Sequence, residues 1–240
     1  MDNEYKEIRN FAEHSLGEMP QVIELLFKLD KESAIEQFTQ NQALYLGRKA
    51  LPLKTRILIA ISVALANGPK ESVMIHYKLA KRYGVESLEI VDAMRATKMA
   101  LMSSTLDSTD ILIDQFNNEE RSSDDEGVSL LLKSVKAEAG IVPDRVITAS
   151  RFSSALVREH LREKKAMLKP VKLSAKEIYA IAFAVSASIR DRECEKVYLD
   201  QFVKNGGNKA EAEDILTITR FLSGNRAFVN GLNVLKILVK

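Results

Sequence analysis

An internal repeat constrains the fold of this sequence more than any other feature. Two stretches align at a constant offset, and each predicts a helix, a break, a second helix, a glycine and a third helix. The identical pairs are Leu51 and Leu173, Lys54 and Lys176, Ile59 and Ile181, Ala60 and Ala182, Val63 and Val185, Gly84 and Gly206, Glu89 and Glu211, Asp92 and Asp214, and Thr97 and Thr219, with Pro20 opposite Pro143 after a one-residue slip. We therefore predict two diverged copies of one helical unit, which close their apolar faces against each other around a pseudo-twofold axis.

The local patterns of the sequence favour an all-α fold. Apolar residues recur at helical spacing almost everywhere, and alternating β-branched runs are few. Residues 53–66, LKTRILIAISVALA, are apolar nearly all round, which predicts a central helix buried on most of its surface. The tripeptide at 67–69 is expected to end this helix and begin the next, and Gly84 to close the second helix with a left-handed cap. A third helix is predicted over roughly residues 86–103.

A polar segment near the middle of the chain predicts the boundary between the two copies. Residues 117–127, NNEERSSDDEG, are mostly acidic and contain no apolar anchor, as is typical of a linker. We therefore expect a first unit at 1–116, an acidic linker at 117–127 and a second, more diverged unit at 128–240.

The charge balance gives no indication of a polyanionic partner. Thirty-five Lys and Arg residues stand against 33 Asp and Glu residues, which leaves a formal charge of +2. The basic run at 158–172, REHLREKKAMLKPVK, contains glutamates and no interleaved aromatic residue, so it predicts a solvated helix face. The N-terminal residues MDNEYKEIRN are polar, and no apolar stretch approaches membrane-spanning length. We expect a cytoplasmic protein that binds neither nucleic acid nor a membrane.

The cysteine and histidine content excludes two further classes. The single cysteine, Cys194, excludes an intramolecular disulfide and the paired-cysteine zinc patterns. The three histidines, at 14, 76 and 160, are scattered along the chain. No metal and no other cofactor is therefore expected.

The residues around the first helix break resemble the carboxymuconolactone decarboxylase family, whose relatives include the AhpD-type thiol peroxidases. The matching stretches are LPLKTRILIA, NGPKESVMIH and YGVESLEIVDA. The resemblance covers residues 20–105 well and 143–235 more faintly. It implies an AhpD-like helical fold. Because single-unit relatives form ring-like oligomers, it also implies a homo-oligomer, with a trimer favoured and a dimer as the simpler alternative.

The first copy departs from the redox branch of that family. That branch has C-x-x-C-x-x-x-H at the break and a glutamate in the preceding helix. Here Pro69 and Ser72 hold the two thiol positions, Ile57 holds the glutamate position, and His76 is retained. Dithiol chemistry is therefore not expected in this copy.

The second copy keeps one thiol without its partners. Asp191, Cys194 and Tyr198 hold the motif positions, and Tyr179 stands at the glutamate position. Arginines near the start of this helix would favour a thiolate at Cys194, although neighbouring acidic residues offset much of that effect. A one-cysteine oxidoreductase that uses Cys194 is one alternative, and a buried, inert cysteine is the other.

The decarboxylating branch, with G-R-E-E-E-L-x-x-H at this point, is more similar to the first copy. Lys70, Glu71 and His76 match it. The resemblance implies a lyase acting on a small carboxylated lactone or a related acid, with His76 and Glu71 as catalytic groups. A histidine that titrates near neutral pH can supply a proton, and Lys70 or Arg56, with Ser72, can hold the substrate.

Two other interpretations of the first copy stay open. His76 shares a helix face with apolar residues, so a packed, hydrogen-bonded histidine without a catalytic role is the structural alternative. A family member that retains the fold for assembly or ligand binding without catalysis is the corresponding functional alternative.

Overall fold

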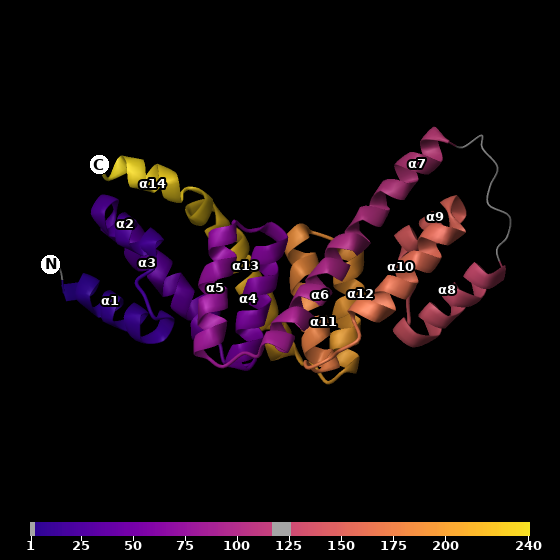
Figure 1. Cartoon of the computed structure of the whole chain (residues 1–240), viewed down its shortest axis with the longest axis horizontal. Coiled ribbons are helices and arrows are strands. Elements are labelled where there is room, and N and C mark those ends of the chain that lie inside the picture. The colour runs from indigo at the N-terminus through magenta and orange to yellow at the C-terminus, as the bar shows by residue number, and fades with distance from the viewer. Residues whose placement is uncertain (1–2, 117–125) are drawn as a thin grey trace. The chain divides into compact units, whose positions relative to one another are not determined.

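The computed structural model of the chain describes residues 3–116 and 126–240, and every element in those ranges is a helix (Figure 1). The all-α prediction is therefore confirmed for the described residues. The predicted linker at 117–127 lies outside them, except for Glu126 and Gly127, which begin helix α8. Within the described ranges no helix combines the length and the apolarity needed to cross a bilayer.

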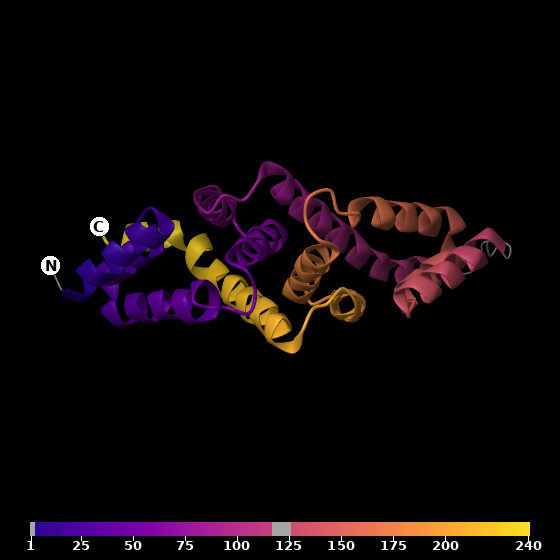
Figure 2. The ribbon, with the colours of Figure 1, turned by 90° about the horizontal axis from the view of Figure 1, so that it is seen from below.

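The chain forms two compact units, and unit 1 comprises Met1–Ser87 and Lys209–Lys240. Its elements are α1 (Asn3–Leu16), α2 (Gln21–Leu29), α3 (Lys31–Asn41), the π-helical turn η1 (Gln42–Leu46), α4 (Leu53–Asn67), α5 (Lys70–Arg82), α13 (Lys209–Asn230) and α14 (Leu232–Leu238). Helix α13 packs against α4 and α5, and it lies beside α4 in both views (Figure 1 and Figure 2).

Unit 2 comprises Leu88–Asn208. Its elements are α6 (Ser87–Ser104, from Leu88 on), the 3₁₀ turn η2 (Thr105–Ser108), α7 (Thr109–Gln115), α8 (Glu126–Ala139), α9 (Asp144–Phe152), α10 (Ser154–Met167), α11 (Ala175–Ile189) and α12 (Arg192–Lys204). The sequence repeat assigns α6 to the first copy and α13 to the second. Each compact unit therefore contains the third helix of the other copy, whereas the predicted units at 1–116 and 128–240 follow the order of the chain.

Two equivalent buried aspartates fix these exchanged helices. Asp214 of α13 accepts hydrogen bonds from the backbone N–H groups of Ala50 and Leu51, at 2.9 and 3.1 Å, just before α4. Asp92 of α6 accepts from the three N–H groups of residues 171–173, at 2.7 to 3.0 Å, just before α11. The repeat aligns both the aspartates and the segments that they bind. A carboxylate that satisfies several buried donors therefore attaches the third helix in each unit.

The predicted central helices and their glycine caps are present in both units. Helix α4 is buried from Thr55 to Ala64, in agreement with its nearly uniform apolar sequence. It ends at Asn67, and α5 begins at Lys70 directly after a proline. Gly84 and Gly206 both adopt left-handed backbone angles, with φ of 67° and 88°. The left-handed cap predicted at Gly84 is therefore confirmed.

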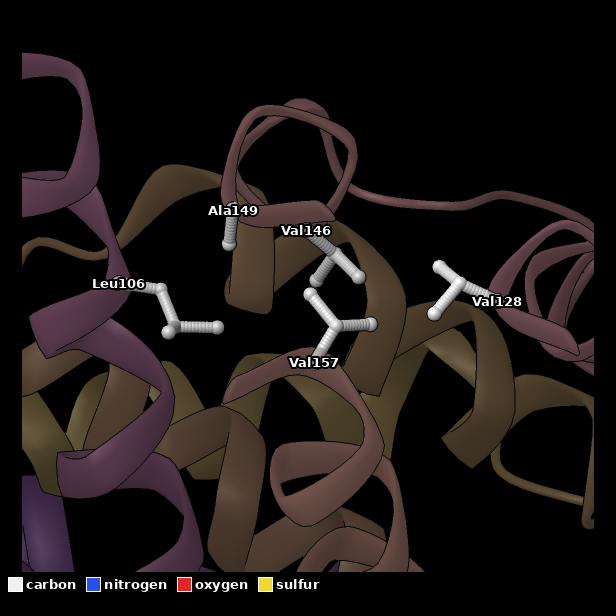
Figure 3. Close-up of a cluster of buried hydrophobic side chains, with 5 residues drawn as sticks. All are labelled: Leu106, Val128, Val146, Ala149 and Val157. Carbon is white, nitrogen blue, oxygen red and sulfur yellow. The ribbon is translucent and has the colours of Figure 1, made fainter. Parts of the chain in front are cut away.

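Smaller apolar clusters hold the outer helices within each unit. In unit 2, five buried side chains from η2, α8, α9 and α10 point toward one another (Figure 3); they are Leu106, Val128, Val146, Ala149 and Val157. In unit 1 the corresponding cluster joins α1, α2 and α3, through Ile8, Ile23, Leu26 and Ala34. The turn η1, which contributes a side chain to the site described below, follows directly on α3, whose Ala34 belongs to the unit 1 cluster.

Candidate functional site

His76 lies on the inward face of α5 and is 7% exposed. Its ring packs edge-on against Tyr45, with ring centroids 5.5 Å apart and an interplanar angle of 81°. The Tyr45 hydroxyl lies 3.5 Å from His76 Nδ1, at the long limit of a hydrogen bond. Tyr45 comes from η1, so the π-helical turn places this phenol against the histidine.

Burial controls the charge of both rings. It lowers the pKa of His76 from its ordinary 6.5 to about 4. Burial likewise raises the pKa of Tyr45 well above its ordinary value. The imidazole is therefore neutral at pH 7, which differs from the expectation of a histidine that titrates near neutral pH. A neutral imidazole can accept a proton or donate a hydrogen bond, but it has no spare proton to release as an acid.

An inner cavity of about 90 Å³ opens beside His76. Its wall combines apolar side chains with neutral polar ones; the polar residues are Gln21, Gln37, Asn41, Tyr45, Ser72, His76 and Asn225, with Glu71 as an ionisable group. Gln37 Nε2 donates to Asn225 Oδ1 at 2.8 Å, which joins α3 to α13 at the cavity. Asn41 Oδ1 is buried and has no hydrogen-bond partner among the described residues. A ligand with a hydroxyl or amide donor would satisfy this acceptor.

An outer cavity of about 290 Å³ adjoins the inner one. The two share seven lining residues, Leu16, Pro20, Gln21, Glu71, Ile75, Leu79 and Leu232, and so form one groove in unit 1. Lys78 lines the outer part, where its Nζ lies 2.8 Å from Glu18 Oε1 in an exposed ion pair. Of the described residues, it is the only lysine or arginine that lines either cavity.

The structure brings together three of the residues predicted for the first-copy site. Ser72 and His76 line the inner cavity, and Glu71 lines both cavities. Lys70, although it precedes them directly on α5, is exposed and lines neither cavity. Helical geometry explains this difference, because adjacent residues on a helix point in different directions.

Arg56 lies apart from the groove and has a different partner. It is buried, and its Nη1 donates to the backbone carbonyls of Tyr45 and Leu46 at 2.8 and 2.6 Å. Its guanidinium therefore joins α4 to the last two carbonyl groups of the π-helical turn. Through this contact Arg56 positions Tyr45.

Cys194 belongs to unit 2, where the repeat aligns it with Ser72 of unit 1. It lies near the start of α12. The side chain is 2% exposed, and burial raises the pKa of its thiol to about 12, although Lys164 opposes the shift. Asp191 caps the helix by accepting from the Cys194 N–H at 3.1 Å, and it also accepts from Arg145 Nη1 at 2.8 Å. The thiol is therefore protonated at pH 7, and the arginines near the helix start do not produce a thiolate.

Sequence reasoning missed Tyr45 and Lys78. Tyr45 lies in a π-helical turn, which hydrophobic periodicity does not indicate. Lys78 could have been found, because it shares the helix face of Glu71 and Ile75 by its spacing of seven and three residues. No comparable signal pointed to its ion-pair partner Glu18, which is distant in the sequence.

The groups that line the groove do not form a metal site. Among the described residues, no three His, Cys, Asp or Glu side chains converge on one point. The groove presents amides, hydroxyls, one imidazole, the carboxylates of Glu18 and Glu71 and one lysine, which suits an organic ligand.

The fold and the site define an all-α chain with a repeated helix–break–helix unit. The carboxymuconolactone decarboxylase family model matches residues 34–105 and 157–236. The chain belongs to the carboxymuconolactone decarboxylase family. The two matched segments contain the His76 and Cys194 positions, respectively.

Comparison with solved structures supports the same fold. The chain is similar to a candidate gamma-carboxymuconolactone decarboxylase subunit from Burkholderia xenovorans LB400, with a TM-score of 0.83 and 16% sequence identity. The likeness covers 97% of this chain and 96% of that one. Comparison with proteins of curated function found no match.

Proposed function

We propose that unit 1 is a lyase site for a small carboxylated lactone or a related acid. The observation that supports this proposal best is the groove that runs from exposed Lys78 to the buried, neutral His76. It offers a cation for a carboxylate at its mouth, an apolar wall in between and a hydrogen-bonding ring at its inner end. Membership of the carboxymuconolactone decarboxylase family agrees with a substrate of this class.

Lys78 would hold a carboxylate that stays on the product, taking it in place of Glu18. The carboxylate to be lost would lie against the apolar wall formed by Ile75 and Leu79, where its negative charge is poorly solvated. When its C–C bond breaks, carbon dioxide leaves and the electron pair passes to the adjoining lactone carbonyl as an enolate.

His76 would stabilise that enolate. If the Tyr45 hydroxyl donates to Nδ1, the neutral ring keeps its proton on Nε2 and donates it in a hydrogen bond to the enolate oxygen. Glu71, which lines both cavities, would relay a proton from water to the product carbon. Ser72 would orient the substrate, while Arg56 acts only through its support of Tyr45.

Three single variants test these roles. Lys78→Met is expected to weaken the binding of small carboxylated lactones about tenfold or more and to leave uncharged lactones unaffected, as measured by ligand-observed NMR. Lys70→Met is the matched control, because Lys70 is adjacent on α5 but lines neither cavity. His76→Gln is expected to retain binding and to lose carbon dioxide release. Equal effects of the two lysine variants would contradict the proposal.

Cys194 receives less support as a catalytic residue. A peroxidase needs an accessible thiolate and a second thiol to resolve the oxidised intermediate. The thiol here is buried and protonated, and it is the only cysteine in the sequence. A thiol-dependent peroxide assay that lost its activity in Cys194→Ser would reverse this order of preference.

We also propose that the chain forms a homo-oligomer, a trimer or a dimer. Exposed apolar side chains recur along one helix of unit 2, where Leu88, Val91 and Met94 of α6 are 51, 47 and 48% exposed. Such a row is typical of a surface that another chain covers. Light scattering after size-exclusion chromatography would test the proposal, and a monomer at micromolar concentration would contradict it.

A further inference from the structure

The inner cavity of the groove contains amide side chains to which the proposed lyase reaction gives no role. His76 and Ser72 already have roles at this cavity, whereas Gln37, Asn41 and Asn225 line it without one. Gln37 and Asn41 belong to α3, and Asn225 belongs to α13. These amides come from both ends of the chain and meet at the inner end of the groove, beyond the part that Lys78 lines.

A hydrogen bond fixes the orientation of two of these amides. Gln37 is 7% exposed, and its Nε2 donates to Asn225 Oδ1 at 2.8 Å. This bond uses a donor of Gln37 and the acceptor of Asn225. Among the described residues, Gln37 Oε1 accepts no hydrogen bond and Asn225 Nδ2 donates none. The pair therefore offers one acceptor and one donor to a ligand in the cavity.

Asn41 adds another acceptor to the same wall. Its Oδ1 is buried and has no hydrogen-bond partner among the described residues. A buried acceptor without a partner costs free energy, and a ligand that donates a hydrogen bond recovers it. The inner cavity is thus richer in unused acceptors than in unused donors.

The hydrogen-bonding capacity of the wall distinguishes between possible ligand groups. A hydroxyl group both donates and accepts, so it can serve Gln37 Oε1 and Asn225 Nδ2 together. A carboxylate only accepts, and it would leave the amide oxygens unpaired. An alkyl group would leave donor and acceptor unpaired alike, and sites that are built to hydrogen-bond a hydroxyl reject such analogues.

The charge and the size of the inner cavity agree with a small neutral group. Among the residues that the structure describes, no lysine or arginine lines it, and its ionisable side chain besides His76 is the carboxylate of Glu71. A carboxylate bound there would be desolvated without a cation beside it. The volume of about 90 Å³ accommodates a hydroxymethyl group, since a single water needs about 10 to 15 Å³.

We propose that the inner cavity is a subsite for a hydroxyl group, and that Gln37 and Asn225 make the groove select ligands that carry one. The inference rests on the proposed function for the orientation of the ligand, with its carboxylate at Lys78 and its lactone carbonyl at His76. A substituent beside that carbonyl then enters the inner cavity. The substrate class is narrowed to carboxylated lactones, or related acids, with a hydroxylated substituent.

The test uses four γ-butyrolactones and the full-length protein. They carry a hydroxymethyl or an ethyl group on the carbon beside the carbonyl, each with and without a carboxylate on the carbon beside the ring oxygen. Ligand-observed NMR would give the four dissociation constants. We expect each hydroxymethyl ligand to bind about tenfold more tightly than its ethyl counterpart, which has a similar size but leaves the amides unpaired. Equal affinities, tighter binding of the ethyl ligands or no binding of either would overturn the proposal.

Substitution of the amides tests whether they cause this preference. Gln37→Met removes the acceptor at a similar side-chain length, and the preference should fall to about twofold or less. Gln40→Met is the matched control, because Gln40 also lies on α3 but bonds to Glu36 and lines neither cavity. Asn225→Leu should act like Gln37→Met and replaces it if that variant does not fold. A preference that persisted in a folded variant of either amide would also overturn the proposal.

The four ligands separate a failure of this inference from a failure of the proposed function. The hydroxymethyl and ethyl ligands differ only at the inner cavity, and their affinity ratio is measured on one protein sample, so a partly unfolded variant does not mimic its loss. The carboxylated and uncharged ligands differ only at Lys78. If the carboxylate does not strengthen binding, the proposed function is wrong, whereas loss of the hydroxyl preference alone contradicts only the inner subsite.

Discussion

The two units place different chemistry at equivalent positions of one scaffold. In unit 1 the helix after the break carries Ser72 and His76, which line a cavity. In unit 2 the same positions carry Cys194 and Tyr198, both almost fully buried, and the helix is capped by Asp191, which is paired with Arg145. A shared helix–break–helix framework therefore does not imply a shared reaction, and each unit has to be understood from its own side chains.

The largest difference between the units should appear at the start of this helix. Asp191→Ala leaves Arg145 buried without its closest partner and removes the cap of α12, so we expect a loss of about 3 to 5 kcal/mol in the free energy of unfolding. The equivalent Pro69→Ala in unit 1 breaks no ion pair, and its cost should stay below about 1 kcal/mol. Urea denaturation followed by circular dichroism would measure both. Similar losses would show that the Arg145–Asp191 pair contributes little.

The two buried histidines, one in each unit, predict that the stability of the folded protein depends on pH. Burial lowers the pKa of His76 from 6.5 to about 4, and burial assisted by Lys164 and Arg145 does the same for His160. The unfolded chain takes up these protons near pH 6.5, but the folded chain does so only near pH 4. The free energy of unfolding is therefore highest above pH 6.5 and decreases as the pH falls toward 4. Below pH 4 it no longer changes with these histidines, and the total loss is on the order of 3 kcal/mol per histidine.

Single substitutions would assign that dependence to each unit. His76→Gln and His160→Gln should each remove about half of the change in unfolding free energy between pH 6.5 and pH 4. A profile that is unaltered in His76→Gln would show that the imidazole is solvated in the folded protein. The proposed role of His76 as a neutral hydrogen-bond donor would then be wrong.

Sequence reasoning recovered the elements that depend on local patterns. The apolar sequence of α4, the proline at the start of α5 and the glycine after it all specify their structure through the backbone or through nearly uniform burial. The exchange of α6 and α13 could not be predicted in this way. Hydrophobic periodicity shows that each of these helices has an apolar face. It does not show whether the helix that packs against this face belongs to the same copy of the repeat or to the other copy.

The candidate site was predicted only in part, because it depends on side-chain direction and on distant contacts. His76, Ser72 and Glu71 were named because they hold motif positions of the family that the sequence resembles, and all three line the groove. Arg56 was assigned to the substrate because of its charge, but its guanidinium is used by the carbonyls of η1. Burial also sets the protonation state of His76, and the extent of burial depends on helices that come from both ends of the chain.

Asp92 and Asp214 attach the exchanged helices α6 and α13, and substitution of each would measure how much it contributes to the free energy of unfolding. Burial alone would raise the pKa of Asp92, but the N–H donors of residues 171–173 outweigh it and hold the pKa below its ordinary value. We expect Asp92→Asn and Asp214→Asn to cost about 1 to 3 kcal/mol each, because buried donors lose a charged acceptor. The exposed Asp200→Asn is the control and should cost less than about 0.5 kcal/mol.

If the two substitutions have unequal costs, the smaller cost identifies the helix that its aspartate holds more weakly.

The contribution of Asp92 to the free energy of unfolding depends on pH. It is present above the ordinary pKa of an aspartate and is lost as the pH falls through the lower pKa of Asp92 in the folded protein. Its variant should therefore match the parent protein in strong acid. A cost for Asp92→Asn that persists there would show that the substitution disturbs packing rather than the hydrogen bonds.

The smallest expected effect concerns the two glycine caps. A Cβ added at Gly84 or Gly206 meets no atom within 4 Å, so only the left-handed backbone opposes alanine, at a cost of about 1 kcal/mol in each unit. Gly224→Ala, inside α13 and equally free of neighbours, should instead stabilise by a similar amount. Thermal denaturation of the three variants would compare them. If Gly84→Ala and Gly206→Ala differ, the units differ in the freedom of their backbones as well as in their side chains, because no contact is available to explain the difference.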